Sequence, residues 1–182
     1  MSKAIGMIEF KTVSAGITAA DTMVKTAQVE LLEAQTVCPG KYIALIGGAL
    51  SAVQAAVEAA KQVRGEELIG SFVLGNPHES IFPAIYGSTH IEKVNAFGIL
   101  ETYDAASIIV AADVAAKTAI VDLVELRIAK GMCGKSYLIL TGEVAAVEAA
   151  IGKAKQAAAK DGMYLDSSVI AHPDEQICRS IL

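Results

Sequence analysis

Tryptophan is absent from the sequence, and aromatic residues make up only 5% of its 182 positions. A cluster of basic residues is also missing, because the 15 Lys and Arg residues are scattered among 20 Asp and Glu residues, for a net charge of -5. Proteins that bind nucleic acid usually concentrate positive charge on one face or along one helix. We therefore expect no nucleic-acid partner.

Long apolar runs are absent as well, although 53% of the residues are hydrophobic and the mean hydropathy is +0.47. Charged residues recur every few positions, whereas a membrane-spanning helix needs about 20 consecutive apolar residues. We therefore expect no membrane partner. The apolar content exceeds ordinary globular usage, and burial at subunit interfaces would account for the surplus. The composition thus predicts a homo-oligomer.

Cysteine is scarce, with three residues in the whole chain, and the sequence opens without the charged and apolar regions of a secretory signal. We expect a cytoplasmic protein on this ground. An odd number of cysteines in such a chain argues against a framework of disulfides. Free or metal-bound thiols are the expected alternatives.

The chain contains an internal repeat. Residues 4–35 align with residues 96–127 at a shift of 92, and 13 of the 32 positions are identical, where chance would give about two or three at typical residue usage. The match continues at a shift of 94 around Gly134-Lys135, and at a shift of 96 between residues 70–81 and 166–177. We interpret the chain as a tandem duplication, with one domain over 1–90 and a second over 95–182.

Each copy has the same expected order of elements. In the first copy, Ala4–Thr12 reads as a strand and Ala15–Thr26 as a helix with Ser14 as N-cap. The remaining predicted elements are the strands Val29–Ala34 and Tyr42–Gly48, the helix Leu50–Val63 and the strand Leu68–Leu74 in the first copy, and Phe97–Tyr103, Ala105–Thr118, Val121–Ala129, Ser136–Thr141, Val144–Ala159 and Met163–Ile170 in the second. This β-α-β-β-α-β order predicts an α+β protein of two ferredoxin-like domains, with helices on one face of an antiparallel sheet.

A turn with a cysteine separates the second and third strands of the first copy. The segment Thr36–Lys41 reads Thr-Val-Cys-Pro-Gly-Lys, so Cys38 would lie at an exposed tip. Taken alone, this pattern leaves two readings open, because a single Cys is about as often a small buried hydrophobe as a ligand.

Several spaced blocks resemble the shell domains of bacterial microcompartments. They are Ala4–Glu9, Ala20–Ala27, the Gly-bearing loop, Gly48 before an Ala-rich helix, and Pro77-His78, and the first two recur as Ala96–Glu101 and Ala112–Ala119. Tandem-domain members of that family form trimers that imitate a hexagonal tile, with the loops after the second strand lining a central pore. The resemblance therefore implies a pseudohexameric homotrimer that assembles with other shell proteins.

The resemblance also implies which residues surround the pore. The first loop would contribute Val37, Cys38, Pro39, Gly40 and Lys41, and the second Met132, Cys133 and Gly134. Members of the tandem type with a Cys-Pro-Gly-Lys loop carry an iron-sulfur cluster at the trimer axis, where Cys38 is the matching ligand. Three copies of Cys38 would then hold a [4Fe-4S] cluster. Cys133 would form a second ring of thiols or be inert, and Cys178 would be a peripheral thiol.

At the rim of the tile, the resemblance implies contacts between neighbouring tiles through Lys25 and Lys117. Each follows an Asp by four residues, which also fits a helix-surface ion pair. The family often has Arg before Pro-His, whereas this chain has Asn76 there and His172 before Pro173. Edge packing is therefore expected to use different contacts.

These observations support three hypotheses on function. The first is a non-enzymatic shell tile whose cluster passes electrons across the shell, to or from an encapsulated or cytosolic redox partner. The second is a selective metabolite pore without a cofactor. The third is a ligand-binding signalling protein, since duplicated α+β domains also bind ligands between their copies.

Overall fold

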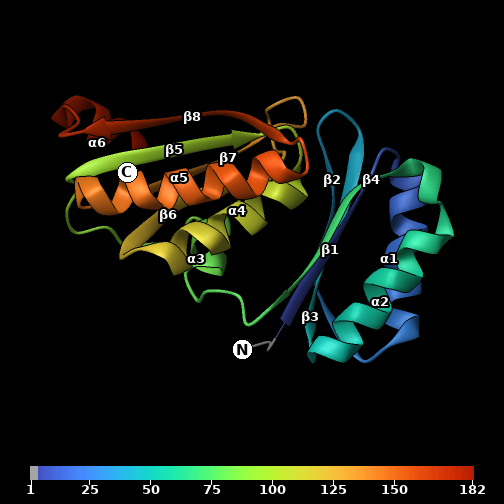
Figure 1. The fold of residues 1–182 in the computed structure, drawn as a ribbon. Helices are drawn as coiled ribbons and strands as arrows, with labels where there is room; N and C mark the ends of the chain where they lie inside the picture. Colours follow the sequence, from blue (N-terminus) through green and yellow to red (C-terminus); the bar gives the residue numbers. More distant parts are fainter. Residues whose placement is uncertain (1–3) are drawn as a thin grey trace. The chain divides into compact units, whose positions relative to one another are not determined.

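The computed structural model describes residues 4–182 and divides into two compact units (Figure 1). Unit 1 contains the described residues up to Pro77 together with residues 104–106 and 129–134. Unit 2 contains residues 78–103, 107–128 and 135–182. Each unit is built around one four-stranded sheet.

The sheet of unit 1 has the strand order β2-β3-β1-β4, with all neighbouring strands antiparallel. The elements follow in the chain as β1 (Ala4–Phe10), α1 (Val13–Thr26), β2 (Val29–Val37), β3 (Lys41–Gly48), α2 (Leu50–Val63), the short 3-10 turn η1 (Gly65–Glu67) and β4 (Leu68–Gly75). Helices α1 and α2 lie side by side over one face of this sheet (Figure 1). The predicted ferredoxin-like arrangement is confirmed.

The core of unit 1 lies between the sheet and these two helices. Four residues spaced along one side of α2 are buried, namely Val53, Ala56, Val57 and Ala60. This spacing places apolar side chains on a single stripe of the helix, which then packs against the sheet. Helix α1 contributes Ala15, Ala19 and Met23 in the same way.

The sheet of unit 2 repeats the order as β6-β7-β5-β8. Its elements are α3 (Ile81–Ile85), β5 (Ala96–Thr102), α4 (Ala105–Thr118), β6 (Val121–Arg127), β7 (Ser136–Gly142), α5 (Val144–Lys160), β8 (Tyr164–Ala171) and α6 (Glu175–Ile181). The first two residues of α4 belong to unit 1. Helix α5 packs along β5 and β8 of this sheet. None of the helices among the described residues combines the length and apolar character needed to cross a membrane.

The two sheets share even their irregularities. In unit 1 the pairing of β2 with β3 shifts register between Leu31 and Glu33, and in unit 2 the pairing of β6 with β7 shifts between Leu123 and Glu125. These positions correspond at the shift of 92 seen in the sequence. A bulge is a specific local arrangement of the backbone, so its recurrence supports the interpretation of the chain as a duplication.

Several local predictions differ from the structure. Strand β1 ends at Phe10 rather than at Thr12, and β2 continues to Val37 rather than ending at Ala34. Thr12, not Ser14, is the N-cap of α1, and its side chain accepts a hydrogen bond from the Ala15 amide at 3.3 Å. Strand β6 ends at Arg127 rather than at Ala129, where φ is +54° and an extended strand cannot continue. The short helices α3 and α6 were not predicted, because they follow no apolar period long enough to detect.

Two glycines provide a matched test of the packing between α2 and the sheet. A Cβ atom at Gly6 on β1 would lie 2.7 Å from Val53 Cγ1 and 2.8 Å from Val57 Cγ2. We expect Gly6→Ala to lower the free energy of unfolding by about 1–3 kcal/mol, because the core would be overpacked. Gly152 in α5 has no atom within 4 Å of the same position, so Gly152→Ala should raise stability by about 0.5–1 kcal/mol.

Urea unfolding at one fixed protein concentration measures both changes, since the stability of an oligomer depends on concentration. Equal effects of the two substitutions would contradict the close approach of α2 to β1.

Candidate functional site: the cysteine loop and its support

Cys38 lies in the turn between β2 and β3. The chain leaves the sheet at Val37, which is buried, and returns at Lys41, so the turn proper is Cys38-Pro39-Gly40. The Gly40 amide donates to the Val37 carbonyl at 2.9 Å and closes the turn. Gly40 has φ of +101°, a conformation that favours glycine. Cys38 itself is half-buried and its thiol is free.

The second predicted pore loop lies against the first within unit 1. The Cys38 amide donates to the Ala129 carbonyl at 3.1 Å, and the Lys41 ammonium donates to the Gly134 carbonyl at 3.3 Å. A Cβ atom on Gly134 would lie 3.0 Å from the Cys38 carbonyl oxygen. The structure thus brings together the two loops that the sequence predicted, and glycine at 134 permits their close approach.

A buried ion pair supports the base of the cysteine loop. The Lys41 ammonium donates to the carboxylate of Glu9 on β1, and both side chains are buried. The second carboxylate oxygen of Glu9 accepts a hydrogen bond from the backbone amide of Ala105 at 2.9 Å, and Ala105 also belongs to unit 1. A charge removed from water is tolerated only when it is paired and hydrogen-bonded. Glu9 meets this requirement through two different segments.

The sequence interpretation assigned no role to Glu9. A signal for it was present, because both partners recur in the second copy: Glu9 corresponds to Glu101, and Lys41 corresponds to Lys135. A carboxylate in an apolar strand and a lysine at the start of a neighbouring strand, each present in both copies, could have drawn attention to the pair in unit 1.

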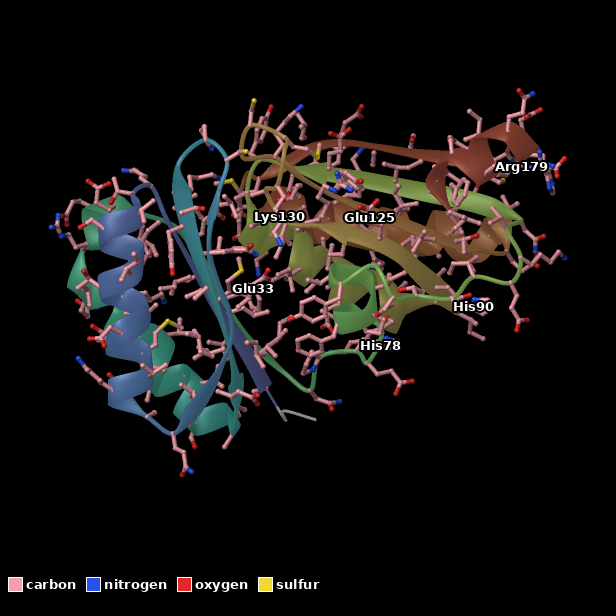
Figure 2. The ribbon with its side chains drawn as sticks, turned by 180° about the vertical axis from the view of Figure 1, so that it is seen from behind. Glu33, His78, His90, Glu125, Lys130 and Arg179 are labelled. Atoms are coloured by element: carbon pink, nitrogen blue, oxygen red, sulfur yellow. The ribbon has the colours of Figure 1, made fainter. Side chains whose placement is uncertain are left out.

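An open pocket of about 390 Å³ borders the cysteine loop. Its lining is Thr36, Val37, Cys38, Pro39, Gly40, Lys130 and Gly131. The Lys130 ammonium lies 3.1 Å from a carboxylate oxygen of Glu33 on β2 (Figure 2), and Gln35 donates to the same oxygen. The pocket therefore has a thiol and a half-exposed cation in its wall.

The other two cysteines differ from Cys38 in their surroundings. Cys133 is exposed and has φ of +52°, beside Met132 in the second loop. Cys178 lies on α6 in unit 2, with its sulfur 3.9 Å from the Pro173 carbonyl. Among the described residues, no three His, Cys, Asp or Glu side chains are grouped so that they could hold a metal ion.

The residues predicted at the tile edge lie on helix surfaces and at strand ends. Lys25 pairs with Asp21 at 2.6 Å and Lys117 with Asp113 at 2.7 Å, each at a spacing of four along its helix. Asn76 and His172 end β4 and β8 in the same way, with φ of +52° and +48°. Their role in contacts between tiles stays a prediction.

A polar cluster in unit 2 was not predicted. Tyr137 donates to Glu125 at 2.6 Å, and Arg127 donates to the other oxygen of the same carboxylate at 2.7 Å. Burial, reinforced by the hydrogen bond and charge of Glu125, raises the pKa of Tyr137 to about 12. Glu125 corresponds to Glu33 in the repeat. The same position therefore carries a bonded carboxylate in both sheets.

The Glu9–Lys41 pair gives the second prediction. We expect Lys41→Met to lower the free energy of unfolding by about 3–5 kcal/mol, because the buried Glu9 carboxylate would lose its countercharge. Lys61→Met is the control, since Lys61 forms a surface pair with Glu58 at 2.7 Å and such pairs contribute less than about 1 kcal/mol. Urea unfolding measures both. In the double variant Glu9→Gln/Lys41→Met, part of the lost stability should return; full additivity would show that the two side chains are not coupled.

Comparison with known proteins gives consistent matches. A family model described as BMC domain matches residues 4–77 and again residues 96–173. The bacterial microcompartment shell protein PduT of Citrobacter freundii is 40% identical over all 182 residues, which cover 99% of its length. The carboxysome shell protein CcmK2 of Synechocystis is 39% identical over 85 residues, covering 44% of the chain and 82% of that protein.

A solved structure matches the fold across the chain. The crystal structure of a microcompartment protein from Desulfitobacterium hafniense superposes with a TM-score of 0.86 at 46% identity, covering 98% of this chain and 99% of that one.

Proposed function

The chain belongs to the BMC-domain family and is a structural shell protein of a bacterial microcompartment, not an enzyme; from this premise we propose that three copies form a tile whose central opening is lined by the cysteine loop. The loop between β2 and β3 projects from the end of the sheet, and the buried Glu9–Lys41 pair lies at its base. In the proposed ring of three chains, this loop faces the axis, so the three equivalent loops lie together around the opening.

At that axis, we propose, three Cys38 side chains hold a [4Fe-4S] cluster. The single observation that carries this proposal is the position of Cys38: a free thiol at the tip of the loop, in the wall of an open pocket. Thiolates are the ligands that iron-sulfur clusters prefer. Three chains supply three of them and leave one iron for another ligand.

The remaining residues of the pocket suit an anionic group. Lys130 is half-exposed in the pocket wall beside Cys38, and its only carboxylate partner among the described contacts is Glu33. When bound, such a cluster supplies one-electron transfer, which would link a redox partner on one side of the shell to the other side.

The trimer is tested by the mass of the protein in solution. We expect light scattering to give three times the chain mass of 18.9 kDa, because a two-domain chain fills two of the six places in a hexagonal ring. A stable monomer across the accessible concentration range would contradict the tile.

Iron analysis tests the cluster. After anaerobic purification or reconstitution, we expect about four iron and four sulfide per trimer, with broad visible absorption. Cys38→Ser should lose the iron and the colour but remain trimeric. Cys133→Ser is the matched control, since it removes an exposed thiol in the neighbouring loop, and it should keep both.

A colourless, iron-free trimer after reconstitution would rule out the cluster and favour a cofactor-free metabolite pore. Loss of iron in Cys133→Ser as large as in Cys38→Ser would contradict the assignment of Cys38 as the sole ligand from each chain.

A further inference from the structure

The segment that follows the first repeat belongs structurally to the second. Residues 78–94 cluster with unit 2, and within that unit α3 packs on β6. Ile81 and Ala84 of α3 are buried. The backbone amide of His78 (labelled in Figure 2) donates to a carboxylate oxygen of Asp113 on α4 at 2.8 Å. This segment therefore forms a strap that packs on β6 and is bonded to α4 through Asp113.

The chain contains a second strap of the same design. Residues 166–177 repeat residues 70–81, so Asp174 corresponds to His78 and Ile177 to Ile81. Both straps leave their sheets through the same left-handed turn, at Asn76 and at His172. The second strap contains α6, which buries none of its residues: Ile177 is 47% exposed, whereas Ile81 is 0% exposed.

The helix and strand that this strap contacts have counterparts in the first copy, and those counterparts are more exposed. In unit 2, Ile109 on α4 is 0% exposed, and the Asp113 side chain is 6% exposed. Their counterparts on α1 are Ile17, which is 52% exposed, and Asp21, whose side chain is 54% exposed. The same contrast holds for the pairs Ala116 and Val24, and Leu123 and Leu31, in which the second-copy residue is buried and the first-copy residue is exposed.

We propose that the second strap, residues 172–182, docks on α1 and β2 of a neighbouring copy of this chain. In this contact the Asp174 amide donates to Asp21 of the neighbour, as the His78 amide does to Asp113. Ile177 enters the apolar surface formed by Ile17, Val24 and Leu31. The occupant is a second copy because this strap repeats the one already seated in the corresponding place of unit 2.

The contact is head-to-tail, since the strap and its surface lie in different halves of the chain. Heterologous contacts of this kind close into rings when the rotation permits. The inference thus rests on the proposed trimer and deepens it, by naming the segment that joins one chain to the next. It also leaves Lys25 accessible, because Lys117 remains 40% exposed beside the Asp113 that the first strap covers.

The test places a charge in the apolar part of the contact. We expect Ile177→Glu and Ile17→Glu each to raise the concentration at which the trimer dissociates by on the order of 100-fold. Ile120→Glu is the control, because Ile120 is 96% exposed and the matching residue in the first copy is Gln28. Sedimentation of serial dilutions measures dissociation. Far-UV circular dichroism should stay unchanged, since both test positions are exposed within the chain, and the milder Ile177→Ser replaces any charged variant that does not fold.

The outcomes separate this inference from the tile itself. If the wild-type protein is trimeric and the Ile177→Glu and Ile17→Glu variants assemble as well as it does, the docking is overturned and the tile is not. Equal dissociation of the Ile120→Glu control would overturn the docking as well. A wild-type protein that is monomeric throughout would overturn the tile, and the docking with it.

Discussion

The carboxylate of Glu9 is the contact on which the geometry of the cysteine loop depends. It is buried on β1, where it accepts hydrogen bonds from the Lys41 ammonium and from the Ala105 backbone amide. Lys41 in turn reaches the Gly134 carbonyl of the second loop. An unpaired charge at this depth would cost several kcal/mol, so the position of Lys41 is tightly specified. Cys38 lies only three residues before Lys41, so the fixed position of Lys41 also restricts where Cys38 can lie.

Most of the fold could be predicted from the sequence, because the signals were periodic and were present twice. The apolar stripe of α2 and the bounds of α2 and α4 agree with the structure. The errors concern positions where the local backbone conformation determines where an element begins or ends. The N-cap of α1 is Thr12 instead of the predicted Ser14, and β6 ends before Ala129, which has a positive φ. Helices α3 and α6 are too short to show a period, and α3 is held by packing on β6 that no local pattern encodes.

The site was only partly predictable. The two loops lie where Pro and Gly predicted turns, and the structure brings them together. The first turn is shorter than predicted, because β2 continues to Val37 and β3 begins at Lys41. Their support was missed, because Glu9 reads locally as one charged residue in an apolar strand, and its partners are distant in sequence. The contact of His78 with Asp113 was missed, because it comes from the backbone amide of His78, which carries no side-chain signature. Such contacts follow from tertiary packing alone.

The two loops of the chain are not copies of each other: the first is Cys-Pro-Gly-Lys, and the second has Met132-Cys133-Gly134 with one thiol displaced by a residue. In the proposed tile, a ring of six identical domains would present six equivalent thiols to a cluster that has only four irons. Duplication within one chain would lower the symmetry of that ring from sixfold to threefold, so a residue would occur three times instead of six. The tandem arrangement would then set the number of ligands, because one loop would hold the cluster while the other loop lies beside it.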